Sequence, residues 1–196
     1  MLGASRTSLG EARTRLHELA STGSADLGTL STDLFSVLAV LVRELPLRRT
    51  LGDASTPAPA KTGLLEALLR DRVSPAALSF LSELVAARWS RPRDLTDAVE
   101  TLAVLASFEQ AVADGSIDEV EDEVFRFARI VEREAALRDA LGDPARTAEA
   151  RGGLLEGLLS GKVGPIALRV ITAAALDTRR SSSVPETLDS YARVAA

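Results

Sequence analysis

The stretch LRRTLGD at residues 47–53 recurs ninety positions further along the chain, as LRDALGD at residues 137–143. The match continues downstream without a gap, because GLLEALL at residues 63–69 falls on GLLEGLL at residues 153–159. Unrelated leucine-rich helices do not share such runs in the same order and at the same spacing. The repeat indicates that one folding unit occurs twice.

The identity between the two copies is densest from residues 43–78 to residues 133–168, where 19 of 36 positions are the same. Upstream of this region the identity fades, but the apolar pattern persists. Five apolar residues of the first copy answer to five of the second, namely Leu34, Phe35, Val37, Val40 and Leu41 to Val124, Phe125, Phe127, Ile130 and Val131. Duplication accounts for both the identity and the pattern.

The composition favours helices, because alanine and leucine dominate while aromatic residues make up only 4% of the chain. Hydrophobic residues at 46% and charged residues at 26% are typical of a globular protein. We therefore predict an all-α fold of two tandem antiparallel bundles, of about six helices each, joined by a shared long helix. The predicted domains are residues 1–97 and 98–196.

Several helix boundaries follow from capping residues. Ser74 before Pro75 predicts an N-cap and a first helical position, where the missing N–H of proline costs nothing. Pro92 breaks the chain, and we expect Asp94 to cap a long helix from about Leu95 to Ala113, before the Asp-Gly stop at 114–115. That long helix is the one that the two copies share.

The Gly-Asp pair that ends each LRxxLGD stretch predicts a turn. We expect Asp53 in the first copy and Asp143 in the second to cap the helix that follows.

The charge of the chain disfavours several classes of function. A net charge of −5 and a pI near 5.1 lack the basic stripe that nucleic-acid binding requires. The absence of cysteine excludes disulfides and thiolate metal sites. We expect no membrane-spanning segment, because the most apolar stretch, residues 34–42, is too short and is followed by Arg43 and Glu44. We expect no secretion signal, because the N-terminus lacks the order of basic and then apolar residues that such a signal has.

Three features could suggest chemistry, and each has a simpler structural explanation. His17 is the single histidine and has no cysteine or second histidine with which to share a metal. Trp89 either covers one end of a bundle or anchors a partner helix, and we favour the first. An acidic run opens a helix whose dipole favours carboxylates, so we expect a solvated helix start rather than a metal site at Asp118, Glu119, Glu121, Asp122 and Glu123.

The sequence contains no glycine-rich phosphate loop, nucleophile elbow or zinc-binding helix motif. We therefore predict a non-catalytic protein without a cofactor or a metal, whose function is binding.

The order of these elements resembles the N-terminal helical domain of the delta subunit of bacterial F-type ATP synthases, the family of the oligomycin-sensitivity-conferring protein. The stretch from Leu102 to Leu168 carries the resemblance in the second copy, through LAVLASFEQA, LRDALGDP and GLLEGLL. In the first copy the best match is the pattern V-S-P-x-x-x-x-F-L-x-x-L, formed by Val73, Ser74, Pro75, Phe80, Leu81 and Leu84. The resemblance covers the whole chain as two successive N-terminal-type domains, an arrangement similar to the longer delta subunits of actinobacteria.

The resemblance implies a peripheral-stalk, or stator, subunit of a proton-translocating synthase, located peripherally at the cytoplasmic face of the plasma membrane. Its implied partner is the N-terminal helix of an alpha subunit, with b-type stalk subunits as a second candidate. The family's C-terminal α/β region, which engages the b subunit, has no counterpart in this sequence. We expect either a fragment or a lineage that lost this region.

The resemblance also implies a groove between the first and fifth helices of each domain, which receives the partner helix. In the first copy the implied lining is Leu9, Ala12, Leu16, Leu19, Ala77, Phe80, Leu81 and Leu84. In the second copy it is Leu102, Leu105, Ala106, Phe108, Ala167, Val170, Ile171 and Ala174. We expect about half of these side chains to face the core, given an apolar stripe of ordinary width.

Two other functions stay open at the level of sequence. A helical adaptor or repeat scaffold unrelated to the synthase would use the same groove. A helical RNA-binding or regulatory bundle is disfavoured by the acidic charge.

Overall fold

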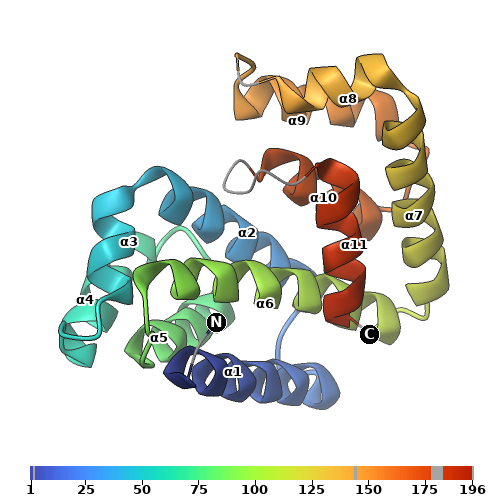
Figure 1. Cartoon of the computed structure of the whole chain (residues 1–196). Helices are drawn as coiled ribbons and strands as arrows, with labels where there is room; N and C mark the ends of the chain where they lie inside the picture. The colour runs from blue at the N-terminus through green and yellow to red at the C-terminus, as the bar shows by residue number, and fades with distance from the viewer. Residues whose placement is uncertain (2, 144, 178–182, 196) are drawn as a thin grey trace. The chain divides into compact units, whose positions relative to one another are not determined.

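The computed structural model describes residues 1, 3–143, 145–177 and 183–195, and within them it contains eleven α-helices and no strand (Figure 1). The all-α class predicted from composition is confirmed. The helices are α1 Gly3–Thr22, α2 Leu27–Arg43, α3 Leu45–Gly52, α4 Ala58–Leu69, α5 Pro75–Ala86, α6 Pro92–Ala113, α7 Ile117–Arg133, α8 Ala135–Gly142, α9 Ala148–Leu159, α10 Pro165–Leu176 and α11 Val184–Ala195. No helix of the described residues is long and apolar enough to cross a lipid bilayer.

The helix bounds repeat at the spacing of the sequence repeat. Helices α2, α3, α4 and α5 begin and end ninety residues before α7, α8, α9 and α10. The duplicated sequence therefore folds twice into the same series of elements, each of the same length.

The chain forms two compact units, Met1–Glu109 and Gln110–Ala196. The long helix α6 crosses the division between them, and most of its residues belong to the first unit. The predicted domain limits at residues 97 and 98, and the sharing of α6 by both copies, stay predictions.

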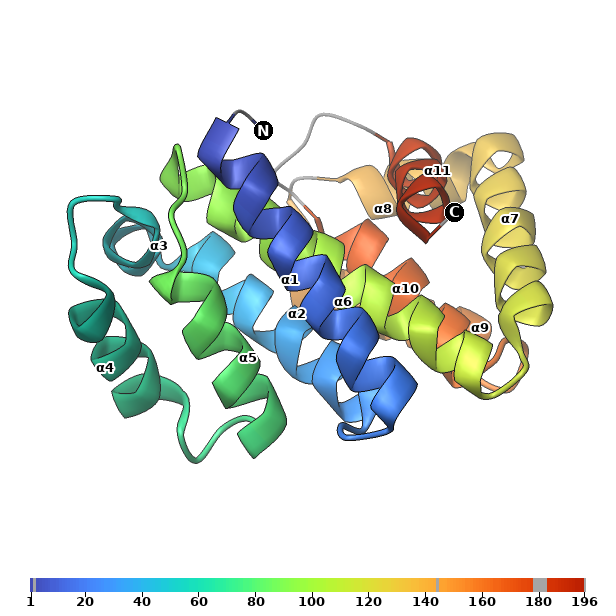
Figure 2. The ribbon, with the colours of Figure 1, turned by 90° about the horizontal axis from the view of Figure 1, so that it is seen from below.

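The first unit has one apolar core, to which α1, α2, α5 and α6 contribute (Figure 2). Leu34 of α2, Leu81 of α5 and Leu102 of α6 are all at most 1% exposed. Each fully buried leucine of this kind contributes roughly 2 kcal/mol relative to an exposed one. Helices α3 and α4 close the unit through Leu51 and Leu65, which belong to the same core.

Polar contacts fix α1 beside α5 and the start of α6. The Ser5 hydroxyl donates to Asp94 Oδ2 at 2.8 Å, the Ser8 hydroxyl donates to the carbonyl oxygen of Arg88 at 2.9 Å, and Arg15 Nε lies 3.7 Å from Glu83 Oε2. The residue numbers of the partners fall from Asp94 through Arg88 to Glu83 as the numbers along α1 rise. Helices α1 and α5 are therefore antiparallel.

The start of α6 differs from the prediction. The helix begins at Pro92, because proline fits the first helical position, and Leu95 lies inside its first turn. Asp94 does not cap the helix. It is buried, it accepts the hydrogen bond from Ser5, and it pairs with Arg91 at 3.3 Å.

The predicted end of α6 is confirmed. Gly115 has φ +69°, in the left-handed region that favours glycine, and its N–H donates to the carbonyl oxygen of Val112. The N–H of Ser116 donates to the carbonyl oxygen of Ala111 at 2.8 Å, which completes a Schellman stop.

Asp53 and Asp143 form turns as predicted, but they do not cap the next helix. Asp53 Oδ1 accepts from the Ser55 N–H at 2.8 Å, and Asp143 Oδ1 accepts from the Ala145 N–H at 2.9 Å. Each side chain is satisfied locally, in an Asx turn, before the helix begins. The N-cap of α9 is instead Thr147, whose hydroxyl accepts from the Ala150 N–H.

In the second unit α7 packs against α10 and α11, and α10 packs against α9. The buried face of α7 carries Val120, Val124, Phe127 and Val131, at helical spacing. Phe125 lies on the opposite face and is 61% exposed.

One long-range contact occurs at the same place in both units. The Asp33 carboxylate of α2 accepts from the Ser74 N–H at 2.8 Å, and the Glu123 carboxylate of α7 accepts from the Gly164 N–H at 2.9 Å. Both backbone groups belong to the N-cap residue of the next long helix, α5 or α10. A carboxylate there meets the positive end of the helix dipole and ties α2 to α5, and α7 to α10.

Candidate functional site

The residues predicted for the first groove lie on two neighbouring helices, α1 and α5. Leu16 and all four residues of α5 are buried in the core, at 3% exposure or less. The half-buried members pack against this core from α1, and they are Leu9, Ala12 and Leu19. Only these three leave apolar surface for a partner.

The residues predicted for the second groove belong to α6 and α10. Seven of the eight are buried, namely Leu102, Ala106, Phe108, Ala167, Val170, Ile171 and Ala174. Leu105 is half-buried. A larger share of the sixteen side chains is therefore buried than the half that we expected, and the grouping of these positions as binding residues stays a proposal.

Charged residues line the outer side of α1. Beside the pair of Arg15 and Glu83, His17 Nδ1 lies 3.1 Å from Glu109 Oε1 of α6, and the His17 side chain is 72% exposed. An exposed pair of this kind contributes little to stability.

Trp89 is core and not a partner anchor in this structure. It is 1% exposed, and its indole N–H donates to the carbonyl oxygen of Leu84 at 2.9 Å. Both its apolar surface and its polar group are satisfied within the first unit.

The acidic run from Asp118 to Glu123 opens α7, as predicted. Asp122 pairs with Arg126 one turn later, and Glu123 binds the Gly164 N–H described above. Within the part of the chain that the structure describes, no group of three or more histidine, aspartate or glutamate side chains is placed to hold a metal ion.

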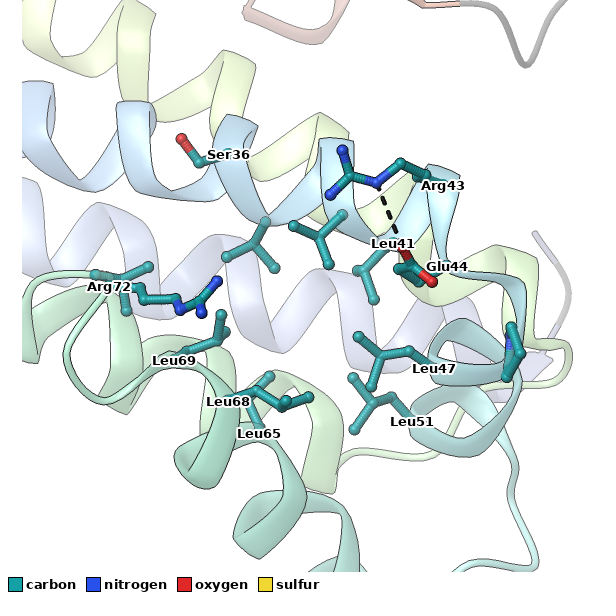
Figure 3. Close-up of a pocket in the computed structure, with 14 residues that line it drawn as sticks. Ser36, Leu41, Arg43, Glu44, Leu47, Leu51, Leu65, Leu68, Leu69 and Arg72 are labelled. Carbon is teal, nitrogen blue, oxygen red and sulfur yellow. Dashed lines mark hydrogen bonds and ion pairs between the residues drawn. The ribbon is translucent and has the colours of Figure 1, made fainter.

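The structure also contains a groove that the sequence did not lead us to predict. It is a cavity of about 580 Å³ in the first unit, between α2, α3 and α4 (Figure 3). Its lining is Ser36, Val37, Val40, Leu41, Arg43, Glu44, Pro46, Leu47, Leu51, Leu65, Leu68, Leu69, Arg72 and Val73. We call it the α2–α4 groove. The sequence signal was present in the retained LRxxL and LLExLL elements, which contribute Leu47, Leu51, Leu65, Leu68 and Leu69 to the lining.

The α2–α4 groove is apolar along its length and charged at its ends. Figure 3 shows Arg72 at one end and Arg43 with Glu44 near the other, with Leu47 and Leu51 beside them. Arg43 Nε lies 3.3 Å from Glu44 Oε1. Among the described residues, no carboxylate lies within ion-pair distance of Arg72.

Two shifted pKa values lie near the start of α4, outside the groove. Hydrogen bonds from the Ser55 N–H and hydroxyl lower the pKa of Asp53. Burial lowers the pKa of Lys61, and the nearby Asp53 charge partly opposes that effect. Neither group faces the apolar lining.

Comparison with known proteins identifies the family to which this sequence is similar. The family model described as ATP synthase delta (OSCP) subunit matches residues 104–196. The relative named ATP synthase subunit delta from Streptomyces griseus is 42% identical over 196 residues, which cover all of this chain and 72% of that protein. The protein of the same name from Thermobifida fusca is also 42% identical, with the same coverage, and that from Frankia casuarinae is 40% identical over 201 residues. Because these relatives are 40–42% identical to this chain along its entire length, the chain belongs to the ATP synthase delta (OSCP) subunit family.

Proposed function

We propose that this chain is a peripheral-stalk (stator) subunit of a proton-translocating F-type ATP synthase. The observation that carries the proposal is the similarity of the entire chain to proteins named ATP synthase subunit delta. The same similarity favours a stator subunit over a helical adaptor unrelated to the synthase. The subunit has no catalytic role of its own, and it is peripheral to the cytoplasmic face of the plasma membrane through the complex.

The proposed mechanism is mechanical. An amphipathic N-terminal helix of an alpha subunit binds a groove of this chain, and this contact holds the catalytic head against the torque of the rotor. A helix in a groove needs only apolar anchors at three- and four-residue spacing. Of the residues that the resemblance implied, those that leave surface for such a contact are the half-buried Leu9, Ala12 and Leu19 of α1 and Leu105 of α6.

Calorimetric titration of the chain with a synthetic peptide of about twenty residues from the alpha N-terminus tests this proposal, since such a peptide spans about 30 Å as a helix. Leu9→Ala and Leu19→Ala should each weaken binding by about 1–2 kcal/mol, the cost of truncating an apolar anchor. Thr7→Ala is the matched control, because Thr7 is exposed on the same helix. A wild-type dissociation constant above the millimolar range would refute alpha-subunit binding.

The b-type stalk subunits are the second candidate partner. If the alpha peptide does not bind and the soluble part of a b-type subunit does, the chain remains a stator subunit with a different contact.

A further inference from the structure

The α2–α4 groove has the lining expected of a binding site for a helix. Its walls are two rows of apolar side chains at spacings of three and four residues, Val37, Val40 and Leu41 on α2 and Leu65, Leu68 and Leu69 on α4. Two such ridges leave between them the holes into which the side chains of a third helix fit. Four residues of helix rise about 6 Å, so each row offers contacts to one or two turns of a partner.

The floor of the groove is buried and its rim is open. Leu51 and Leu65 are 1% and 2% exposed, whereas Leu68, one turn along α4, is 43% exposed. Exposed leucines of this size are ordinary when they are scattered singly. Leu68 is not single, because it borders a cavity that other apolar side chains line.

The duplication shows which parts of this surface were retained. Eight of the fourteen lining positions are identical ninety residues later, and a ninth conserves its charge, Arg72 becoming Lys162. By contrast, of the eight positions proposed on α1 and α5, only Ala77 has an identical counterpart, Ala167. Burial explains why core leucines are retained, but it does not explain Leu68 and Leu158, which are 43% and 38% exposed.

The second unit exposes apolar side chains at the same register. Ile130 of α7, which corresponds to Val40, is 49% exposed, and Leu158 of α9 corresponds to Leu68. The surface of α7, α8 and α9 therefore offers the same type of contact as the α2–α4 groove; we call it the α7–α9 surface.

Charge identifies the partner's chemistry. Arg72 and Lys162 occupy the same place at the end of each apolar row, and neither has an ion-pair partner among the described residues. Because Arg43 pairs with Glu44, Arg72 gives the lining of the α2–α4 groove a net positive charge, and Lys162 lies at the matching position of the second unit. A partner helix that carries a carboxylate at that end would neutralise each of them.

We propose that the α2–α4 groove and the α7–α9 surface are two equivalent docking sites for one kind of partner segment, an acidic amphipathic helix that the partner presents in at least two copies. The helix places apolar side chains at three- and four-residue spacing along the groove, and a glutamate or aspartate against Arg72 or Lys162. The identity of that partner as a synthase subunit rests on the proposed function, whereas the two sites do not.

Two probes separate this inference from the proposed function. The first is the alpha N-terminal peptide used above. The second is a designed peptide of about eighteen residues with leucines on one helical face and a glutamate one turn beyond them. Both are titrated by calorimetry into the full chain, which gives affinity and stoichiometry. We expect two peptides of the designed sequence to bind each chain.

Single substitutions then assign the sites. Leu68→Glu should remove one bound peptide and Leu158→Glu the other, each lowering site affinity at least about tenfold because an apolar anchor is replaced by a carboxylate that repels the acidic peptide. Arg72→Glu should weaken binding about fivefold and reduce its dependence on salt. Leu45→Glu is the matched control, because Leu45 is 46% exposed on α3 and does not line the groove. Circular dichroism establishes that each variant is folded.

Each outcome decides between the proposals. If the designed peptide binds twice and the alpha peptide does not bind, the sites stand and alpha-subunit binding fails. If the designed peptide does not bind, while the alpha peptide binds with the same affinity to Leu68→Glu and Leu158→Glu and is weakened only by Leu9→Ala or Leu19→Ala, this inference is overturned and the proposed function stands. If neither peptide binds, both are overturned. Dimerisation of the chain that Leu68→Glu abolishes would also overturn it, since the groove would then hold a second copy.

Discussion

Gly52 and Gly142 occupy the same place in the two copies, at the end of the LRxxLGD element, but their surroundings differ. A Cβ on Gly52 would lie 2.4 Å from the Cα of Pro92, which is backbone and cannot move away easily, whereas a Cβ on Gly142 would meet nothing within 4 Å. The glycine is therefore required sterically in the first copy alone.

Alanine at these two positions should have opposite effects. Gly52→Ala should destabilise the chain by about 2 kcal/mol through overpacking against Pro92. Gly142→Ala should be neutral or stabilise by up to about 1 kcal/mol, because alanine loses less backbone entropy in a helix. Urea unfolding of both variants measures the difference, and equal effects would show that the contact with Pro92 contributes nothing.

Lys61 should make stability depend on pH at the alkaline end. It is 2% exposed, and burial lowers its pKa below the ordinary value of 10.5. Between the lowered pKa and 10.5 the unfolded chain binds more protons than the folded one, so the free energy of unfolding should rise with pH across that window. Lys61→Met should remove this rise and stabilise the chain at neutral pH by roughly 1 kcal/mol.

Thermal unfolding of Lys61→Met and wild type at neutral and alkaline pH checks this expectation. Loss of stability at neutral pH in the variant would mean that the pairing of Lys61 with Asp53 outweighs the cost of its burial.

Some single-residue roles could be predicted from sequence and others could not. Ser74 caps α5 as predicted, since its hydroxyl accepts from the Ala77 N–H. This cap depends only on neighbours in the chain. The role of Asp94 was missed because its partner, Ser5, is 89 residues away. A local pattern cannot reveal such a partner.

At the scale of elements, the contact between α2 and α5 should behave like that between α7 and α10. Asp33→Ala and Glu123→Ala each remove a charged acceptor from a helix N-terminus and should cost about 1–2 kcal/mol. Glu121→Ala, on the exposed face of α7, is the control and should change stability little. Unfolding midpoints by circular dichroism measure these costs; values near zero for both variants would show that water satisfies Ser74 and Gly164 equally well.

Helix bounds were largely predictable because proline, glycine and capping residues mark where helices begin and end. It was harder to predict which face of each helix is buried and which is exposed. The family resemblance implied a groove between the first and fifth helices, but periodicity alone does not distinguish a side chain that faces the core from one that lines a groove. The α2–α4 groove was missed for the same reason.

At the scale of the whole molecule, the sharing of α6 can be tested by truncation. A fragment ending at residue 97 loses Leu102, Ala103 and Ala106 from the core of the first unit, and it leaves Ser31 without the carbonyl oxygen of Ala103. We expect residues 1–113 to unfold cooperatively on heating and residues 1–97 not to, because such losses exceed a small domain's margin of stability. Equal stability of the two fragments would place the domain limit at residue 97 and end the case for a shared helix.

The repeat allowed the recurrence of one series of helices to be predicted, because the same pattern of residues occurs twice in the same order. Family membership then followed from the order of the elements, none of which is specific alone. The repeat could not show which of the duplicated surfaces binds a partner, because duplication retains core residues and contact residues alike. Only the exposed fraction of a side chain, as at Leu68 and Leu158, distinguishes the two.

We propose that this chain holds the catalytic head through the alpha subunits. Co-sedimentation of the chain with isolated catalytic heads, intact or with the N-terminal segments of their alpha subunits removed by limited proteolysis, tests this contact. We expect binding to intact heads and loss of binding, by at least about tenfold in affinity, to the trimmed ones. Equal binding to both, or binding to neither, would contradict it.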